Sequence, residues 1–585
     1  MATLVLELSL TRIFSVVFYY HFAFLAISLA LFGLGAGGVF SYVVAARKGN
    51  FFVKLGTLAA LNALAVVVSL VFVIGQGGHA SVLTFALIYF ASSLPFFLSG
   101  AIVSLAVSET IHRVDRVYFF DLLGAAVGCF ALLPFLNSLG GPNTVLAAAV
   151  LFAVSSAVWF NCAVSKRGRA AAVVLALALV ALIAYNGRWR VIDIHYAKNQ
   201  KIPQEIFSKW NVMSRIGITK DLLIVIDADA STGISQFDFD RLLDRERHEL
   251  LSEGPGFPYV IRPGAKTMII GPGGGWDVAR SLASGAKDIT AVEINPIIAN
   301  TIMREKFPQF SHGLYLRPEV HVHVEDGRSF VRRSTEKYQV LQATLVDTWA
   351  STAAGAFALS ENNLYTTDAV RDYLTHLTDD GLLAFTRWGF QPPRESLRLL
   401  SLAYAAFQQI GEPDLASHVV VLRENPEKLG GWGSQDTVLI FRKPISQDDL
   451  ARLKAGLVNS KVDLIYAPRE PVKNAFADFL HASDKEQFWR DYPFDVSPVS
   501  DDRPFFFYTV QARDLLQFWE HHEDSADYKI NRAVPLLFGL VAISIIATGV
   551  ILALPPLLLK ARLPVEKGLR TFLWYFVCLG AGYIM

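Results

Sequence analysis

Residues 268–296 read MIIGPGGGWDVARSLASGAKDITAVEINP, and this stretch decides how the polar middle of the chain folds. It contains an apolar run, a glycine-rich turn, a helical pattern and a second apolar run that ends on an acid. Gly271, Gly273 and Gly275 leave room for a sharp turn and for a ligand to approach the main chain. The helix that follows begins with unpaired N–H groups, which favour an anionic group. Glu293, about twenty residues further on, stands where an acid accepts hydrogen bonds from ribose hydroxyls.

Strand and helix patterns alternate through the rest of this polar region. Two further apolar runs end on acids: Asp326 and Gly327 follow the third strand, and Asp347 follows the fourth. Such alternation predicts an α/β domain with a doubly wound, parallel, Rossmann-like sheet, in which ligands bind at the carboxyl ends of the strands. The turn alone is a weak signal, but the turn, Glu293 and Asp326 in this order favour a nucleoside-type ligand over a turn that serves packing only. Asp277 is a further candidate in the first turn of the helix.

The chain outside this region is strongly apolar. Hydrophobic residues make up 53% of the 585 residues and charged residues only 18%, which is typical of a membrane protein with a soluble part. A membrane-spanning helix needs about 20 apolar residues, and runs near this length lie at 55–75, 81–107, 117–139, 144–164, 170–185 and 533–559. Two neighbouring runs, 2–19 and 22–44, predict a tight helical hairpin. The run from 571 to 585 is short for a complete span, so we expect the sequence to be a fragment of a longer chain.

These patterns divide the chain into five parts. The parts are N-terminal transmembrane helices (1–187), a small β-rich lead-in (188–260), a Rossmann-like domain (261–445), a C-terminal extension of the soluble domain (446–530) and C-terminal transmembrane helices (531–585).

Basic residues gather in alternate short loops, which the positive-inside rule places in the cytoplasm. These loops lie at 47–54, 113–116, 166–169 and 560–570. Counting spans from them puts the soluble domain outside, whereas a nucleotide-like cofactor is made in the cytosol. Because one miscounted helix reverses the answer, the sequence leaves the side of the soluble domain open.

Other polar residues carry weaker signals. All three cysteines lie in apolar runs, so neither a disulfide framework nor a cysteine metal site is expected in the soluble part. His321 and His323 alternate along one strand, but a third ligand is not evident, and EHHED at 520–524 is better explained as a polar helix surface. We therefore predict no metal site.

Charged residues inside apolar runs are expensive and usually face the interior of a bundle. Glu7 and Arg12 lie in the first run, and one interpretation is that they neutralise each other. Asp121 lies in another run, where a role in helix packing and a substrate pathway are equally supported. The net charge of +1 gives no sign of a nucleic-acid partner.

The motifs quoted above carry a resemblance to a known family. The turn GPGGGWD is similar to the GGGDGG turn of spermidine synthases, VEIN to their VEID, and EDGRSF to their DGR segment. The strand YQVLQATLVD resembles the family strand that ends in DSSD. The sequence thus resembles the polyamine aminopropyltransferases, within the class I methyltransferase fold, and more closely the multi-span bacterial membrane proteins of spermidine-synthase-like type. SPVSDDRPFFFY at 497–508 is similar to a segment of these membrane-bound relatives, for which the residues themselves indicate no role.

The resemblance implies a sulfonium co-substrate, S-adenosylmethionine or its decarboxylated form, which donates a carbon to a nucleophile, usually a small amine or polyamine. It places Asp347 on the catalytic aspartate, where a carboxylate would anchor the amine and accept its proton as the new bond forms. Asp326 and Gly327 fall on the adenine side of the donor. This chemistry involves no metal.

The chain departs from the family in the amine half of the site. Gly274 stands where aminopropyltransferases have the aspartate that grips the free ammonium of the decarboxylated donor, and Asp277 would have to reach from the helix to replace it. S-Adenosylmethionine keeps its carboxylate, which suits bare N–H groups. The turn therefore favours methyl transfer, while the family favours aminopropyl transfer. Thr344 replaces the first aspartate of DSSD, and Ser231 stands roughly where a substrate-contacting glutamine is expected.

The sequence thus predicts a membrane-anchored transferase of a bacterial inner or plasma membrane that moves an aminopropyl or methyl group to an amine-type acceptor. The expected partners are this acceptor and the lipid bilayer, and a homo-oligomer is left open. One alternative is a non-catalytic domain of a transporter-like protein that senses a polyamine or a nucleoside. Another is a purely structural domain that binds no ligand.

Overall fold

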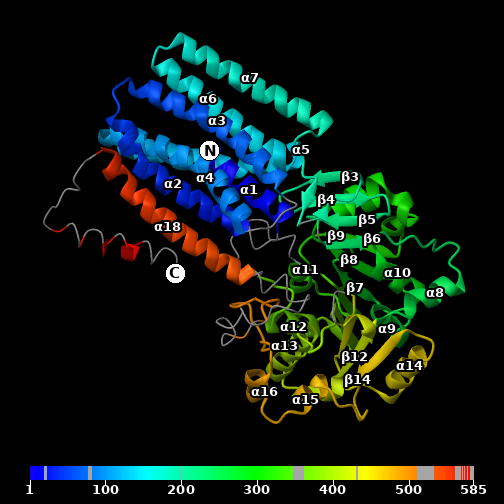
Figure 1. The fold of residues 1–585 in the computed structure, drawn as a ribbon. Helices are drawn as coiled ribbons and strands as arrows, with labels where there is room; N and C mark the ends of the chain where they lie inside the picture. The colour runs from blue at the N-terminus through cyan, green and yellow to red at the C-terminus, as the bar shows by residue number, and fades with distance from the viewer. Residues whose placement is uncertain are drawn as a thin grey trace.

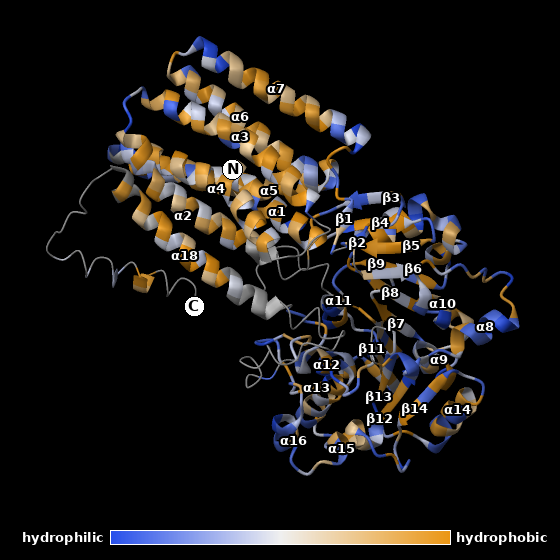
Figure 2. Cartoon of the chain, in the orientation of Figure 1, coloured by the Kyte–Doolittle hydropathy of each residue, from blue (hydrophilic) through white to orange (hydrophobic). Residues whose placement is uncertain are grey.

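The computed structural model describes residues 1–18, 23–76, 82–198, 200–228, 230–346, 361–429, 433–509, 511, 533–559, 568, 571, 574–575 and 577–579. These residues form two parts, a bundle of helices and an α/β domain that lies against one end of the bundle (Figure 1). Apolar residues cover the bundle, whereas apolar and polar elements alternate in the α/β domain (Figure 2). The predicted combination of a helical bundle with an inserted α/β domain is therefore confirmed.

The bundle contains eight of the described helices. They are α1 (Ala2–Val17), α2 (Ala23–Ala46), α3 (Phe51–Gly75), α4 (Val82–Glu109), α5 (Val114–Leu139), α6 (Gly141–Cys162), α7 (Lys166–Trp189) and α18 (Ala533–Leu559). Helices α2 to α7 are each long and apolar enough to cross a membrane. Helix α18 packs against α2 and α4 although more than 400 residues separate it from them in the sequence. Of the last predicted run, 571–585, the structure describes residues 571, 574–575 and 577–579.

Short turns keep successive helices antiparallel. Gly140, with a φ of 78°, ends α5, and Pro142 lies in the first turn of α6, where its missing N–H leaves no hydrogen bond unmade. The side chains of Asn50 and Ser165 cap α3 and α7. The turn of the predicted hairpin between α1 and α2 lies outside the described residues.

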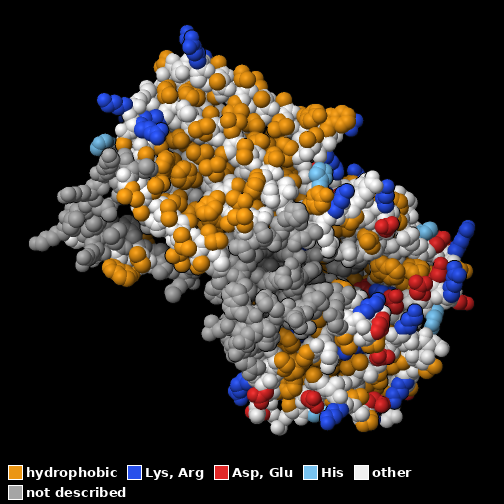
Figure 3. Space-filling model, viewed as in Figure 1, with side chains coloured by type: hydrophobic (Ala, Val, Ile, Leu, Met, Phe, Trp, Pro, Cys, Tyr) orange, Lys and Arg blue, Asp and Glu red, His pale blue; other side chains and the backbone are white. Residues whose placement is uncertain are grey.

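Basic residues lie at both ends of the bundle, and Arg188 and Arg190 are at the end of α7 that meets the α/β domain. The α5–α6 turn and the end of α7 meet strand β3 (Glu205–Trp210) of the α/β domain. Basic side chains gather at the opposite end, far from the α/β domain (Figure 3). They include those of the loops at 47–54 and 166–169 that were noted in the sequence.

Helix α1 lies inside the bundle and corrects one interpretation of the sequence. It is 16 residues long and is surrounded by α2, α5 and α6. Arg12, which is 2% exposed, donates two hydrogen bonds of 3.1 Å to the carboxylate of Asp227 in the α/β domain. Arg12 is therefore neutralised by Asp227, and the interpretation that it pairs with Glu7 is wrong. The reason is that Arg12 lies at the end of α1 that meets the domain.

The β-rich lead-in is an antiparallel meander. Its strands, in the order β3-β4-β5-β6, are Glu205–Trp210, Arg215–Thr219, Leu223–Ile226 and Ala230–Gly233, and a small ladder of β1 (Tyr196–Ala197) and β2 (Gln200–Lys201) precedes them. Asp227 and Ala228 turn the chain between β5 and β6 with positive φ angles, which short polar side chains such as aspartate tolerate best. We call β5, this turn and β6 the β5–β6 hairpin.

An eight-stranded sheet forms the centre of the α/β domain. Its order is β14-β12-β13-β11-β10-β7-β8-β9, with β7 Thr267–Ile270, β8 Ile289–Glu293, β9 Val320–Val324, β10 Tyr338–Thr344, β11 Leu377–Trp388, β12 Val419–Glu424, β13 Gln435–Phe441 and β14 Val462–Tyr466. The five strands from β11 to β9 are parallel, and the other three are antiparallel. The doubly wound arrangement is confirmed, but the prediction of a parallel sheet holds for the first five strands only. Along the antiparallel edge β13 lies between β11 and β12, and β14 pairs with the other side of β12.

Helices cover both faces of this sheet. They are α8 (Asp244–Leu251), α9 (Phe257–Ile261), α10 (Trp276–Ala283), α11 (Gly327–Arg333), α12 (Thr367–Thr375), α13 (Glu395–Gln409), α14 (Gln447–Leu457), α15 (Ala475–His481) and α16 (Lys485–Asp491), with a π-helix at Ile297–Lys306. Leu341 and Leu383 face the core that contains α12 and α13, whereas Val340 and Leu382 face the core that contains α9 and α14. Burial on both faces explains why these strands are almost continuously apolar.

Candidate active site

The glycine-rich turn follows β7 at the point where the strand order reverses, since β8 and β10 lie on opposite sides of β7. Gly271 has a φ of 67°, and a Cβ there would lie 2.8 Å from a methyl carbon of Val346 at the end of β10. Only glycine meets both conditions without strain. Helix α10 then begins at Trp276, with Gly275 as its N-cap in a left-handed conformation. The predicted strand, turn and helix are present.

Gly274 has a further reason to be glycine. A Cβ at this position would lie 1.9 Å from the carbonyl oxygen of Gly233, in the β5–β6 hairpin. The N–H of Ser235 also donates to the carbonyl of Gly274 over 2.8 Å. The main chain of the hairpin therefore fills the space in which an aspartate of an aminopropyltransferase turn would stand.

Glu293 ends β8 and points its carboxylate at the turn. It is 5% exposed and accepts hydrogen bonds from the N–H groups of Gly273, at 3.2 Å, and Asn295, at 2.9 Å. Burial raises the pKa of Glu293 above its ordinary value of 4.5, and the two N–H donors oppose this effect. The acid is therefore fixed beside the turn, as the sequence predicted.

Asp326 and Gly327 lie after β9, where α11 begins. Asp326 is the N-cap of this helix, and its Oδ1 accepts from the N–H of Ser329 over 2.8 Å. A Cβ on Gly327 would lie 2.5 Å from Ile270, so glycine lets this loop approach the end of β7 closely. The ends of β7, β8 and β9 are thereby brought to one edge of the sheet.

A cavity of about 360 Å³ lies at this edge, which is within the range of about 300–1,000 Å³ typical of small-molecule sites. The predicted site residues that line this cavity are Gly271, Gly273, Glu293, Asp326 and Gly327. Its other lining residues are Ser214, Ile226, Ala230, Ser231, Thr232, Pro255, Ile270, Trp276, Arg280, Val292, Ile294, Asn295, Ile298, Thr344, Leu345, Val346, Leu364 and Gln435. The crevice expected from the sequence is thus open.

Two predicted residues lie outside the lining of this cavity. A Cβ on Gly275 would lie 2.5 Å from Leu314, so glycine lets the turn pack closely against this side chain. Asp277 is buried behind the turn and accepts a hydrogen bond of 2.7 Å from Arg280, which also pairs with Glu253. Because Asp277 is committed to this ion pair, it does not replace the aspartate missing at position 274. Burial raises the pKa of Asp277, and the charge of Arg280 opposes this effect.

The predicted catalytic residue, Asp347, lies outside the described residues. The structure does describe Val346 before it and Leu364 after it, and both line the cavity. Tyr365 joins these two sides, because its hydroxyl donates to the carbonyl of Val346 over 3.0 Å.

The sequence did not anticipate that the β5–β6 hairpin would form one wall of the cavity. Ile226, Ala230 and Thr232 line this wall together with Ser231, which was noted only as a departure from the family. The wall is anchored through Asp227, whose carboxylate binds Arg12 and also accepts from the N–H of Arg215 over 2.7 Å. The sequence indicated a β-rich lead-in at 188–260, but the local sequence contains no sign of the helix against which this hairpin docks.

Gln435 is a second lining residue that sequence reasoning missed. It begins β13, an antiparallel strand that pairs with β11. With Thr344 it gives this side of the cavity neutral polar groups in place of carboxylates. Among the described residues, groups of three or more metal ligands are absent. His321 and His323 lie on β9, and the ring of His323 packs against Phe330.

No family model matches the chain. A polyamine aminopropyltransferase from Pectobacterium atrosepticum is 30% identical over 102 residues, which are 17% of this chain and 34% of that protein. Over these residues the chain is similar to an aminopropyltransferase. The match spans about a third of the relative's length.

Several solved structures also resemble the chain. A spermidine synthase in complex with the transition-state analogue AdoDATO is 15% identical, with a TM-score of 0.31 over 50% of this chain and 87% of that one. A probable spermidine synthase from Corynebacterium glutamicum is 14% identical, with a TM-score of 0.34 over 49% and 96%. Human methyltransferase-like protein 13 in complex with SAH is 14% identical, with a TM-score of 0.24 over 36% and 87%.

Proposed function

We propose that the α/β domain is a transferase that binds a donor of the S-adenosylmethionine type in this cavity and moves an alkyl group from its sulfonium to a small acceptor. The observation that carries the proposal is the convergence of the turn, Glu293 and Asp326 on one open cavity at the reversal of strand order. Ligands of doubly wound sheets bind at such a point. The partial sequence match to an aminopropyltransferase supports the same class of reaction.

The adenosine half of the donor fits the sheet side of the cavity. The carboxylate of Glu293 would accept hydrogen bonds from the ribose hydroxyls. Asp326 uses Oδ1 to cap α11, which leaves Oδ2 for the amino group of the base. The N–H of Gly273, which Glu293 holds in place, lies beside the ribose position.

The turn favours S-adenosylmethionine over its decarboxylated form. A decarboxylated donor ends in an ammonium that needs an acid at position 274, and the carbonyl of Gly233 fills that space. Asp277 is paired with Arg280 and gives no replacement. S-Adenosylmethionine carries a carboxylate beside its ammonium, so it needs less negative charge from the protein. Methyl transfer is therefore the form of the reaction that we propose.

In this reaction the carbon–sulfur bond of the donor breaks and a carbon–nitrogen bond to the acceptor forms. The sulfonium becomes a neutral thioether, and the acceptor nitrogen loses a proton. We assign the proton to the carboxylate of Asp347, which would release it to solvent afterwards. The neutral side chains of Thr344 and Gln435 fit an amine that binds in its uncharged, reactive form.

Calorimetric titration of the full chain in detergent tests the proposal. We expect S-adenosylmethionine and methylthioadenosine to bind, and decarboxylated S-adenosylmethionine to bind more weakly than S-adenosylmethionine. Asp347→Asn is expected to keep donor binding and lose turnover, while Glu325→Gln, a half-buried acid that pairs with Arg333 and does not line the cavity, serves as the control. Tighter binding of the decarboxylated donor would show that the interpretation of Gly274 is wrong. Absence of binding by all three compounds would contradict the proposal as a whole.

A second candidate function is a sensor that binds a nucleoside or polyamine without turnover. The placement of charge favours it, because the basic loops lie at the end of the bundle far from the α/β domain (Figure 3). By the positive-inside rule this end is cytoplasmic, which puts the α/β domain on the other side, away from cytosolic S-adenosylmethionine.

Labelling of single thiols in intact cells separates the two candidates. Cys162 lies exposed at the basic end of the bundle, and Ser483 is exposed in the α/β domain. One variant keeps Cys162 alone, and the other carries Ser483→Cys with all native cysteines replaced by serine. The transferase requires that an impermeant maleimide reach the thiol at 483 only after lysis. Labelling of that thiol in intact cells, with Cys162 protected, would favour the sensor.

A further inference from the structure

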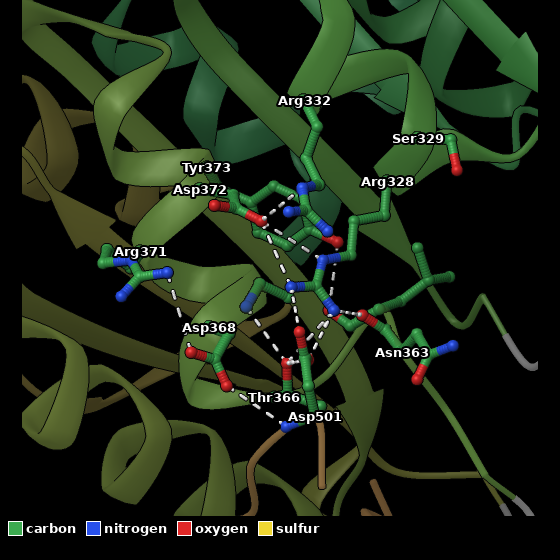
Figure 4. A network of polar contacts seen from close by, with 12 residues as sticks. Arg328, Ser329, Arg332, Asn363, Thr366, Asp368, Arg371, Asp372, Tyr373 and Asp501 are labelled. Atoms are coloured by element: carbon green, nitrogen blue, oxygen red, sulfur yellow. Dashed lines mark hydrogen bonds and ion pairs between the residues drawn. The ribbon is translucent and has the colours of Figure 1, made fainter.

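Arg328 connects the cavity to the C-terminal part of the domain. It follows Asp326 and Gly327 directly, but its side chain is buried on the side away from the cavity. Its guanidinium donates to Asp501 over 2.6 and 2.8 Å, to Asp372 over 3.2 Å, and to the carbonyl of Asn363 over 3.0 Å (Figure 4). One side chain therefore joins α11, α12, the chain before α12 and the segment that contains Asp501.

Asp501 belongs to the segment 495–509, which we call the strap. It contains the whole of SPVSDDRPFFFY, the motif for which the sequence indicated no role. Arg398, fully buried in α13, donates to the carbonyls of Asp495, Phe506 and Tyr508, the last two over 2.7 Å. The N–H of Asp495 donates to the carbonyl of Thr509 over 2.9 Å, so the two ends of the strap meet. The strap is thus a fixed element of the domain.

The strap also fixes the chain that leads into α12. The N–H of Asn362 donates to the carbonyl of Pro504 over 2.7 Å, and the N–H of Thr367 donates to that of Val499 over 2.8 Å. Between them, the hydroxyl of Thr366 donates to the carboxylate of Asp501 over 2.7 Å. Leu364, which lines the cavity, lies in the middle of this stretch.

Aromatic packing extends this support to the other side of the cavity. The ring of Tyr365 lies 4.7 Å from that of Phe506, centroid to centroid, in the strap. The hydroxyl of the same tyrosine holds the carbonyl of Val346. The strap therefore supports both Val346 and Leu364, and through Arg328 it also supports the loop that contains Asp326 and Gly327.

We propose that Arg328 and Asp501 are a positioning pair through which the strap sets the geometry of the cavity. The pair contacts three segments that line the cavity or adjoin its lining. They are the β9–α11 loop, the start of α12 and the stretch around Leu364. This role rests on the proposed function, because the cavity is the donor site of that proposal. It extends the proposal by assigning a site function to a motif more than 170 residues away from Arg328 in the sequence.

The charges favour a positioning role over a purely stabilising one. The side chain of Asp501 is 40% exposed, and Arg328, which is 7% exposed, keeps Asp372 as a second acidic partner when Asp501 is replaced. Its hydrogen bonds with Arg328 and Thr366 lower the pKa of Asp501, so both carboxylate oxygens remain acceptors at neutral pH. A bidentate arginine–carboxylate pair fixes orientation as well as distance. Loss of the pair should therefore disturb the geometry more than the melting temperature.

Asp502 provides a matched control, since it is the exposed neighbour of Asp501 and shows no hydrogen bond or ion pair among the described residues. The full chain in detergent would be compared as wild type, Asp501→Asn, Asp502→Asn and Arg328→Lys. Hydrogen–deuterium exchange is measured without ligand on peptides that cover 326–333 and 361–366. Binding of S-adenosylmethionine and methylthioadenosine is measured by calorimetry.

We expect Asp501→Asn and Arg328→Lys to raise exchange in both peptides and to weaken binding of both probes about three- to tenfold. Asp502→Asn should match wild type, and Asp501→Glu should restore part of the loss. Exchange in Asp501→Asn equal to that of wild type overturns the proposal, and so does raised exchange with unchanged binding. If wild type binds neither probe, the proposed function fails, and the exchange measurement alone then decides whether the pair positions these segments.

Discussion

The two walls of the cavity are held in different ways. The sheet wall consists of the ends of β7, β8 and β9 with the glycine-rich turn, Glu293 and Asp326. Its elements are neighbours in the sequence and are joined by the hydrogen bonds of parallel strands. Glu293 and Asp326 each bind main-chain N–H groups within 20 residues of their own positions. This wall is therefore fixed by local structure.

The hairpin wall is fixed from a distance. Its turn residue Asp227 is 4% exposed and pairs with Arg12, which lies 215 residues away in the bundle. Lys198, close to the end of α1, donates to the carbonyl of Asp227 over 2.9 Å. The difference teaches that the sheet wall is held within the α/β domain, whereas the hairpin wall depends on the bundle. A structural change in the bundle therefore acts directly on the hairpin wall of the cavity.

Removal of Arg12 should give the largest effect. Arg12→Met leaves the buried carboxylate of Asp227 without its cation, which typically costs about 3–5 kcal/mol. We expect a large fall in melting temperature and loss of the hairpin wall, measured by thermal unfolding in detergent and by exchange across the β5–β6 hairpin. The sheet wall should keep its protection from exchange.

Arg47→Met is the control for this substitution, because Arg47 is exposed at the far end of the bundle. The double variant Arg12→Met with Asp227→Asn should recover much of the loss, because it removes both charges together. Equal loss of protection in both walls would show that they form one unit, and the comparison above would then be wrong.

A substitution in the sheet wall should act on binding instead. Glu293→Gln keeps the volume and can still accept the N–H of Gly273, but it removes the charge that would bind the ribose hydroxyls. Hydrogen bonds to charged groups contribute about 1.5–3 kcal/mol, so affinity for methylthioadenosine should fall about 10- to 150-fold. Glu325→Gln, at the end of the next strand and paired with Arg333, should leave affinity unchanged. Unchanged affinity in Glu293→Gln would remove the ribose assignment.

The same contrast explains what could be predicted from the sequence. The turn, Glu293 and Asp326 were identified because strand ends and glycines are local signals, and the structure brings them to one cavity. The antiparallel strands β12, β13 and β14 were not identified, because a fully buried antiparallel strand shows the same apolar run as a parallel one. Gln435 was missed for that reason.

Long-range pairing limited the remaining predictions. Arg12 was assigned to Glu7, its neighbour in the sequence, because no local pattern identifies a partner 215 residues away. Asp277 was assigned to the site because it lies in the first turn of α10, but Arg280, three residues later, binds it behind the turn. Whether Asp347 has its predicted role stays a prediction, since it lies outside the described residues.

Acidification should separate stability from binding at Glu293. Burial raises the pKa of this residue above 4.5 in the folded protein. The stabilisation that comes from its protonated form is therefore fully present below the pKa of the unfolded chain, and it is lost as pH rises through the folded pKa. The pH dependence of donor binding has the opposite sign, because only ionised Glu293 accepts hydrogen bonds from both ribose hydroxyls. Affinity for methylthioadenosine should therefore fall as pH drops through this raised pKa. Calorimetry from pH 8 to about pH 5 checks this, and Glu293→Gln should show a flat profile over the same range.

The smallest effect is expected from Ser231→Ala in the hairpin wall. Ser231 lines the cavity and is exposed, and surface substitutions usually change free energies by no more than about 0.5 kcal/mol. Affinity for S-adenosylmethionine should then change by less than about threefold, because Ser231 contributes one exposed hydroxyl to the lining. A loss of tenfold or more would place the donor against the hairpin. The bundle would in that case act on donor binding directly, because Arg12 of the bundle anchors the hairpin through Asp227.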